Sequence, residues 1–262
     1  MGSPFSLKGR SAVVTGGGRG IGAAVARGLA EAGADVCIGF RTREDAAEQV
    51  RKACAAFGVK ASTCAADLTS PTGARHLVDQ AVQRFGALDI CVHSAGIWPV
   101  DDAPVSLLAE ERWAATMRQN VDAMFFVAKA AVAAMVASRP VVAARAGRLV
   151  FVSSTAGQRG EAGHADYAAS KGAMISFVKS MAVEVASEAI TVNAVAPGWV
   201  DTDMCEAPFR DGGRDRISAA IPVGRIATPE DIAFPTVCLC LSGARHVTGE
   251  IVNVNGGSVL CG

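Results

Sequence analysis

The sequence carries no excess of charge of either sign. Among its 262 residues, Lys and Arg together number 25, and Asp and Glu together also number 25. Without a net positive field, nothing concentrates DNA, RNA or anionic lipid at the protein surface. The composition therefore disfavours a nucleic-acid-binding protein, and we expect no nucleic-acid partner.

The sequence also lacks a long uninterrupted apolar run. Its first ten residues, MGSPFSLKGR, contain no apolar core of a signal peptide, and the most apolar stretch, 121–138, is interrupted by Asp122 and Lys129. A membrane-spanning helix needs about 20 predominantly apolar residues. We therefore expect a cytoplasmic location and no membrane partner.

Metal-binding and redox motifs are missing as well. The eight cysteines are scattered through apolar segments without a CxxC pair, and the four histidines are isolated. Cys238 and Cys240 lie two residues apart but have no histidine at a zinc-finger spacing. The cysteines are therefore expected to be mostly small core residues, and no metal site is predicted.

Short apolar runs rich in β-branched residues alternate with helical stretches along the chain. The expected strands are 11–15, 35–40, 60–64, 89–93, 148–154, 191–195 and 250–254, and the expected helices are 21–32, 44–57, 71–85, 110–138, 167–186 and 229–241. This alternation predicts an α/β fold with a doubly wound, seven-stranded parallel sheet and helices on both faces. No linker or repeat divides the chain, so residues 1–262 are expected to form a single domain.

One long segment, 197–228, has neither strand nor helix periodicity. It follows a predicted strand, and ligands bind beyond the carboxyl ends of strands in such sheets. Long irregular segments in compact domains are usually functional lids or disordered. Residues 199–225 are therefore predicted to be a substrate lid.

A glycine-rich stretch, TGGGRGIG at 15–22, connects the first predicted strand to the first predicted helix. Without Cβ atoms, the backbone can approach a pyrophosphate at the positive end of that helix. A tight turn without a ligand is the alternative. The spacing TGxxxGxG of Gly16, Gly20 and Gly22 favours dinucleotide binding.

Arginines stand where an acidic residue would be expected for NAD. The second predicted strand ends at Phe40 and is followed by Arg41-Thr42-Arg43. Guanidinium groups make charge-assisted bonds to phosphate, so Arg19 and Arg41, with Arg43 as a third candidate, indicate the 2′-phosphate of NADP. Asp67 either accepts a hydrogen bond from the adenine amino group or caps the helix near Pro71.

The chemical centre is predicted in VSSTAGQRGEAGHADYAASK at 152–171. Tyr167 and Lys171 are four residues apart on a predicted helix and share a face, where the ammonium is expected to lower the tyrosine pKa. Tyr167 can then act as a general acid toward a carbonyl. Ser154 either orients that carbonyl or caps a turn. Asn120, inside an apolar helix, either bends the helix and binds water or satisfies backbone groups.

Together with HSAG at 93–96, NAVAPGWVDT at 193–202 and VTGEIVNVNGG at 247–257, these motifs resemble those of the single-domain short-chain dehydrogenase/reductase family over essentially the whole chain. The resemblance implies a Rossmann fold and hydride transfer between NADP(H) and a carbonyl. In it, Tyr167 is the acid or base, Lys171 also holds the nicotinamide ribose, Ser154 orients the substrate and Asn120 holds a relay water. The cofactor would contact Gly16, Gly18, Arg19, Gly20, Ile21, Gly22, Arg41, Asp67, Leu68, Ser94, Ala95, Gly96, Tyr167, Lys171, Pro197, Gly198, Val200 and Thr202.

Two segments depart from the family pattern. His93-Ser94 replaces the usual Asn-Asn, for which we expect altered packing around the cofactor without loss of activity. The run 137–148 before the fifth predicted strand is longer than the usual turn, and nothing in the sequence indicates its role.

The segments YAASKGAMISFVKSMAVEVAS and TVNAVAPGWVDTDM are similar to those of 3-oxoacyl-carrier-protein reductases. The expected substrate is therefore an apolar 3-oxoacyl thioester, carried by coenzyme A or an acyl carrier, with Trp199 and Met204 beside Ser154 and Tyr167. Arg145 keeps one basic position that would meet an acidic carrier, whereas Glu188 occupies another. Arg210, Arg214 and Arg216 either meet a substrate phosphate or form a solvated face.

Alternatives are an NAD-dependent dehydrogenase of a sugar, polyol or sterol and a dinucleotide-binding regulator without activity. The resemblance and the small apolar residues of AKAAVAAMVA at 128–137 also predict a homotetramer.

Overall fold

The computed structural model describes residues 4–138 and 146–260, and within them a single parallel sheet organises the chain. Its seven strands are β1 (Ser11–Thr15), β2 (Asp35–Phe40), β3 (Ala61–Ala65), β4 (Ile90–His93), β5 (Gly147–Val152), β6 (Ile190–Pro197) and β7 (Ile251–Val254). They pair in the order β3-β2-β1-β4-β5-β6-β7. The predicted doubly wound α/β Rossmann fold is confirmed, with its switch point between β1 and β4.

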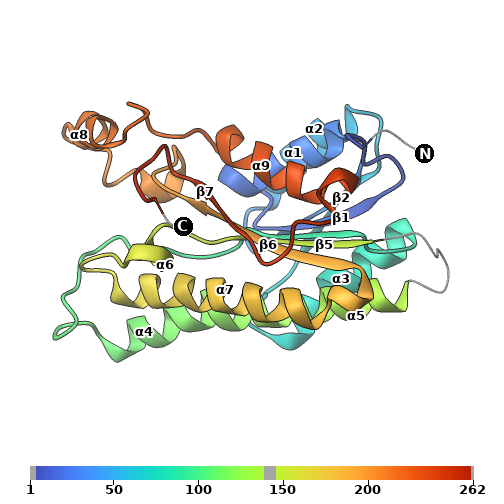
Figure 1. Cartoon of the computed structure of the whole chain (residues 1–262), viewed down its shortest axis with the longest axis horizontal. Helices are drawn as coiled ribbons and strands as arrows, with labels where there is room; N and C mark the ends of the chain where they lie inside the picture. The colour runs from blue at the N-terminus through green and yellow to red at the C-terminus, as the bar shows by residue number, and fades with distance from the viewer. Residues whose placement is uncertain (1–3, 139–145, 261–262) are drawn as a thin grey trace.

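Helices cover both faces of this sheet (Figure 1). One layer holds α1 (Gly20–Glu31), α2 (Glu44–Ala55) and α9 (Pro229–Cys240), and the other holds α3 (Pro71–Phe85), α5 (Ala123–Ala137) and α7 (Ala165–Glu184). The two layers enclose two separate apolar cores, one on each side of the strands. Five cysteines are buried, as expected, while Cys205 and Cys238 are half-buried and Cys261 lies outside the described residues.

The helix starts follow local chemistry. The Ser70 hydroxyl accepts from the Gly73 N–H at 3.1 Å and Pro71 is the first residue of α3. At α9, Thr228 and Asp231 form a reciprocal capping box, and Pro229 is the first residue of the helix. These side chains satisfy backbone N–H groups that the helix leaves free, and they fix where each helix begins.

The expected single helix over 110–138 is interrupted. It consists of α4 (Glu110–Met117), a π-helical turn, η1 (Arg118–Asp122), and α5. By length and composition, the stretch Glu110–Ala137 could cross a membrane, a test that core helices of soluble proteins also pass. In the most apolar 18-residue window of this stretch, only 39% is buried inside the single chain. Much of its apolar surface therefore faces outward.

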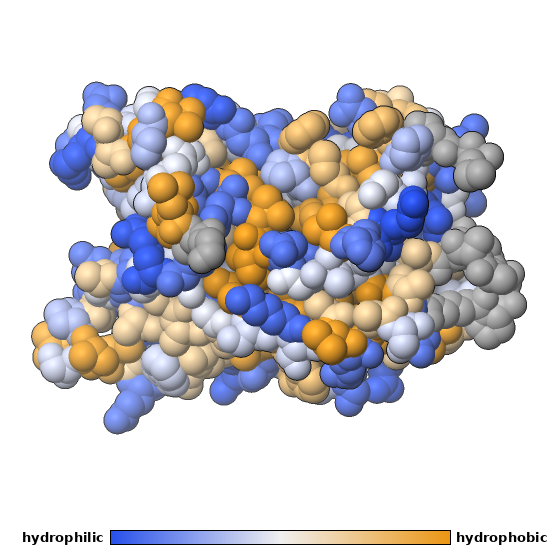
Figure 2. Space-filling model, viewed as in Figure 1, coloured by the Kyte–Doolittle hydropathy of each residue, from blue (hydrophilic) through white to orange (hydrophobic). Residues whose placement is uncertain are grey.

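The remaining short elements lie at the carboxyl edge of the sheet or join the main ones: α6 (Ala156–Arg159), η3 (Ala186–Glu188), η4 (Asp203–Cys205), α8 (Gly213–Ala220) and η5 (Ser242–Ala244). The predicted lid contains η4 and α8, whose periodicity is not apparent in the sequence. In Figure 1, α8 lies beyond the end of α9. Figure 2 shows apolar residues gathered over β7, between the two helix layers.

Candidate active site

The glycine loop between β1 and α1 has the close packing expected of a dinucleotide cradle. A Cβ atom on Gly16 would lie 3.0 Å from the Ala95 Cα atom, and one on Gly22 would collide with the Gly16 carbonyl oxygen. Arg19 precedes α1 without capping it through its side chain, and the first turn of α1 contains no acidic residue. The positive helix end is thus left for an anion, which fits the pyrophosphate of a dinucleotide.

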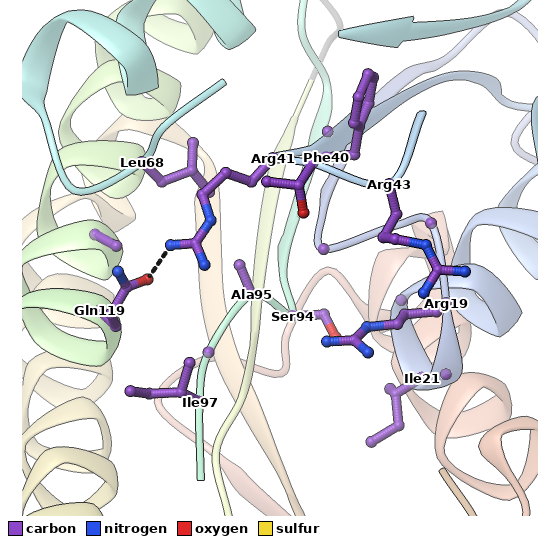
Figure 3. A pocket seen from close by; sticks show the side chains of 18 of the residues that line it. Arg19, Ile21, Phe40, Arg41, Arg43, Leu68, Ser94, Ala95, Ile97 and Gln119 are labelled. Carbon is purple, nitrogen blue, oxygen red and sulfur yellow. Dashed lines mark hydrogen bonds between the residues drawn. The ribbon is translucent and has the colours of Figure 1, made fainter. Parts of the chain in front are cut away.

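Arginines lie on two sides of the cleft that begins at this loop (Figure 3). Arg41 reaches across it, and its Nη1 atom donates to Gln119 Oε1 at 3.0 Å. Arg19 and Arg43 lie on the other side of this view, and their largely exposed side chains pair with Asp203 at 3.2 Å and with Asp45 at 3.4 Å. Three guanidinium groups in one cleft suit an additional phosphate, as on NADP.

Most of the remaining predicted cofactor residues line the same cleft, namely Gly18, Gly20, Ile21, Leu68, Ser94, Gly96 and Thr202. Asp67 also lines it, and its Oδ1 atom accepts from the Thr69 N–H and hydroxyl at 3.0 and 2.8 Å. The alternative that Asp67 caps the following helix is wrong, because Ser70 occupies that position. Within the described residues, the other predicted cofactor residues are not among those that line the cleft, namely Tyr167, Lys171, Pro197, Gly198 and Val200.

Thr15 ties the loop after β4 to the end of β1. Its hydroxyl oxygen accepts from the N–H groups of Ser94 and Ala95, both at 3.1 Å, and lies 3.1 Å from His93 Nδ1. Because the oxygen accepts two bonds, its own hydrogen is free to bond Nδ1, which indicates the neutral imidazole with the proton on Nε2. Burial and the Lys171 charge lower the pKa of His93 to about 3. His93 and Ser94, which replace the usual Asn-Asn of the family, are thus held in place by contacts with the Thr15 hydroxyl.

Asn120 lies in the π-helical turn and is fully buried. Its side chain accepts from the Ile97 N–H at 2.8 Å and donates to the Ile97 carbonyl at 2.9 Å and to Ser170 Oγ at 3.0 Å. The side chain therefore clamps the loop after β4. Of the two alternatives for Asn120, the amide does satisfy backbone groups, those of Ile97. The helix is also distorted at this residue, by the π-helical turn.

Ser154 and Tyr167 meet at the carboxyl edge. Ser154 follows β5 and accepts from the Ala156 N–H at 3.1 Å. Burial raises the pKa of Tyr167, the nearby Glu161 and Cys205 add to the rise, and a hydrogen bond with Ser154 partly opposes it. The phenol is therefore protonated at neutral pH, as a general acid must be before it donates.

Lys171 lies beneath this pair, and burial lowers its pKa to about 8. Its Nζ atom donates to the Val152 carbonyl at 2.8 Å and lies 5.8 Å from the centre of the Tyr167 ring. The expectation that the ammonium lowers the Tyr167 pKa is wrong for the chain by itself, because burial dominates and Nζ faces the ring instead. A Cβ atom on Gly96, which lines the cleft, would lie 3.6 Å from Nζ, so this lysine lies close to the cleft.

Two arginines of the predicted lid already form ion pairs with carboxylates of the same segment. Arg214 holds both oxygens of Asp201, at 2.6 and 3.0 Å, and Arg210 holds Glu206 at 3.0 Å. These partners reduce the charge available for a substrate phosphate. Arg145 lies outside the described residues, and Glu188 is half-buried in η3.

Four residues near the site were not predicted from the sequence. Gln119 contacts Arg41, and Trp98, Glu161 and His164 form a group close to Tyr167. Trp98 follows a predicted strand by a few residues, the only signal the sequence offers for it. Within residues 4–138 and 146–260, no group of three or more His, Cys, Asp or Glu is arranged to hold a metal ion.

A glycine-lined cleft at the carboxyl edge of a doubly wound sheet, with a serine, a tyrosine and a lysine at the same edge, is typical of a dinucleotide-dependent oxidoreductase. A sequence model described as enoyl-(acyl carrier protein) reductase matches residues 16–258. The chain belongs to the short-chain dehydrogenase/reductase family, as its motifs predicted.

Curated relatives and solved structures match nearly the whole chain. The 3-oxoacyl-[acyl-carrier-protein] reductase of Vibrio cholerae is 39% identical, and that of Escherichia coli 37%, each over 97% of this chain and 98% of the relative. A Beutenbergia cavernae structure provisionally described as an NAD(P)-dependent gluconate 5-dehydrogenase, with bound NADP at low occupancy, is 37% identical with a TM-score of 0.88. It covers 98% of this chain and 99% of its own. A Sinorhizobium meliloti structure provisionally described as a short-chain alcohol dehydrogenase is 32% identical, with a TM-score of 0.90 and 98% coverage of both chains.

Proposed function

We propose that this protein is an NADPH-dependent carbonyl reductase that converts a 3-oxoacyl thioester or a similar ketone into the hydroxy compound. The observation that carries the proposal is the cleft itself, which is lined by three arginines and by Gly96, whose added Cβ atom would lie 3.6 Å from Lys171 Nζ. The similarity to 3-oxoacyl-[acyl-carrier-protein] reductases supports the choice of substrate.

The side chains have defined tasks in such a reduction. NADPH, when bound, supplies the hydride that reaches the carbonyl carbon. Tyr167 donates its proton to the carbonyl oxygen while the Ser154 hydroxyl orients that oxygen. The phenolate left on Tyr167 is then reprotonated through the ammonium group of Lys171. The backbone of Asn120, distorted by the π turn, is the expected site of the relay water, because its side chain is already engaged.

A second candidate is a dehydrogenase of a sugar or polyol. The gluconate dehydrogenase structure above is as similar in sequence as the Escherichia coli reductase. Arg210 and Arg214, which would attract a carrier or coenzyme A, are paired with carboxylates of their own segment. A carbohydrate substrate would require neither arginine.

A panel of carbonyl and alcohol substrates with both cofactors tests the proposal. We expect NADPH-dependent reduction of acetoacetyl-coenzyme A and of acetoacetyl-N-acetylcysteamine. Efficient turnover of a sugar, polyol or sterol, with inert thioesters, would establish the second candidate instead. Binding of NADPH without reduction of any compound would indicate a regulator.

We also infer that the protein is a cytoplasmic homotetramer. Exposed apolar side chains lie on the long helices and α9, with Phe125 at 44%, Val183 at 80% and Phe234 at 74% exposure. β7 is a half-buried edge strand, which natural proteins usually cover. Light scattering at micromolar concentration should give four times the chain mass, and a monomer mass would refute the assembly.

A further inference from the structure

A cluster of aromatic and charged side chains lies beside the proposed reacting groups and takes no part in the chemistry described above. We call Trp98, Glu161, His164, Trp199 and Phe209 the Trp98 cluster. Its members come from three segments: the loop after β4, the stretch before α7, and the lid. All five are buried or half-buried.

Trp98 is the centre of this cluster. Its indole stacks on the His164 ring with the centroids 4.6 Å apart and the planes at 14°. It meets the Trp199 ring edge to face at 6.2 Å, and Trp199 lies 6.0 Å from Phe209. Aromatic contacts of this kind hold the rings in fixed orientations. The aromatic rings therefore connect the lid to the loop after β4.

Glu161 is the only carboxylate of the Trp98 cluster. Only 23% of its side chain is exposed, and burial raises its pKa. Its Oε1 atom accepts one hydrogen bond, from Trp98 Nε1 at 3.2 Å. Glu161 precedes Tyr167 by six residues in the stretch before α7, and its charge acts on the Tyr167 phenol, so the carboxylate lies near the proposed proton donor.

The charged neighbours of Glu161 donate no further hydrogen bond to its carboxylate. His164 Nδ1 is 3.8 Å from Oε1 and 3.4 Å from Asp102 Oδ1, but neither ring nitrogen makes a hydrogen bond within the described residues. Arg159 acts on Glu161 only electrostatically. An ionised carboxylate has about four acceptor positions, and a partly buried one is stabilised when they are filled.

We propose that Glu161 is a specificity-determining residue that accepts a hydrogen bond from an O–H or N–H group of the substrate, while Trp98 and Trp199 contact the adjacent carbons. The inference rests on the proposed carbonyl reductase function and narrows it. The preferred ketone carries a hydrogen-bond donor near the carbonyl. A pantetheine thioester offers an amide N–H, and a hydroxyketone offers an O–H.

Two matched substrate pairs test this inference. The thioester pair is acetoacetyl-N-acetylcysteamine, which has an amide N–H, and acetoacetyl butylthioester, which lacks one. The hydroxyketone pair is 1-hydroxy-2-butanone and 3-pentanone, in which a methyl group replaces the hydroxyl. The measured quantity is the ratio of kcat/KM between donor and donor-free members, with NADPH, in the wild type and its variants.

Glu161→Leu should lower the donor ratio by about 10- to 100-fold, the usual effect of losing a charge-assisted hydrogen bond. Glu161→Gln keeps an acceptor oxygen and should give an intermediate ratio. Trp98→Phe keeps an aromatic ring but removes the N–H donor, and should preserve most of the ratio. Glu110→Leu, which removes an exposed carboxylate on α4, is the control and should leave the ratio unchanged.

The outcomes separate this inference from the proposed function. An unchanged ratio in Glu161→Leu and Glu161→Gln, or a wild type without preference for donors, overturns the inference. If the thioesters are inert but the hydroxyketone pair depends on Glu161, the inference stands and the thioester substrate is wrong. If no member of either pair is reduced, both fail. Should Glu161→Leu not fold, the wild-type preference and Glu161→Gln still decide.

Discussion

The ammonium of Lys171 faces the ring of Tyr167, with Nζ 5.8 Å from the ring centre, and donates to the Val152 carbonyl at 2.8 Å. Both side chains are buried, and burial acts on them in opposite directions. It raises the pKa of Tyr167 and lowers that of Lys171 to about 8. The lysine, rather than the tyrosine, is therefore expected to limit the reaction on the alkaline side.

For reduction by NADPH, kcat/KM should be constant through neutral pH and should fall above a pKa near 8, as Lys171 loses its proton. The pH profile of kcat/KM reports groups of the free enzyme. Tyr167 is the only tyrosine in the chain, so tyrosinate absorbance follows its titration separately. Tyrosinate that forms in step with the loss of rate would assign the limb to Tyr167 instead.

Two neighbouring serines allow a matched comparison. Ser154→Ala removes the hydroxyl that bonds Tyr167, and we expect kcat to fall roughly 10²-fold, as on loss of an oriented donor. Ser153 Oγ donates instead to the Lys171 carbonyl at 3.1 Å. Ser153→Ala should cost about 1 kcal/mol of unfolding free energy and keep most of kcat. Equal kinetic effects in the two variants would argue against the role of Ser154.

Cofactor preference should depend on the arginines of the cleft. We expect NADPH to be preferred, and Arg41→Asp to reduce the ratio of kcat/KM for NADPH to that for NADH. Loss of one charged phosphate contact costs about 1.5–3 kcal/mol, or roughly 10- to 100-fold. Arg27→Ala is the control, because Arg27 lies on α1 and pairs with Glu230 at 3.0 Å. A wild type that prefers NADH, or an unchanged ratio in Arg41→Asp, would contradict the assignment.

His93 should make the fold sensitive to acid. Its pKa is about 3 in the folded chain, below the ordinary value near 6.5, so between these limits the unfolded chain binds a proton that the folded chain does not. Stability is therefore lost as the pH falls below 6.5, by about 2 kcal/mol at pH 5. Urea unfolding at pH 7 and pH 5 measures this loss.

In the same experiment, His93→Asn should lose less stability than the wild type between pH 7 and pH 5. The exposed His76 on α3 provides the control, since His76→Asn should behave like the wild type. An equal loss of stability in wild type and His93→Asn would show that other groups cause the acid sensitivity.

The sequence predicts those parts of the fold that depend on local signals. β1, β2 and α3 have the expected bounds, because a short apolar run marks each strand and Pro71 marks the helix start, and both signals are encoded within a few residues. The π-helical turn at Asn120 could not be predicted, since it accompanies hydrogen bonds to Ile97, which is 23 residues away. The short helix α8 has little amphipathic pattern for a sequence to reveal.

The site shows the same division. The placement of Ser154, Tyr167 and Lys171 at one edge follows from strand order and helical spacing. The raised pKa of Tyr167 does not, because it depends on burial by segments distant in sequence. The Trp98 cluster likewise joins Trp98 to residues more than 60 positions away, and no local signal indicates that these side chains meet.

The most direct test of the account compares NADPH oxidation by the wild type, Tyr167→Phe and Ser153→Ala with acetoacetyl-N-acetylcysteamine as substrate. General acid catalysis typically contributes about 10²–10⁴-fold, so kcat should fall by that factor in Tyr167→Phe. NADPH binding, followed by cofactor fluorescence, should persist, and Ser153→Ala should retain most of kcat. A Tyr167→Phe variant with near-normal kcat, with hydride transfer shown to be rate-limiting by a deuterium isotope effect, would contradict the assignment of Tyr167 as the proton donor.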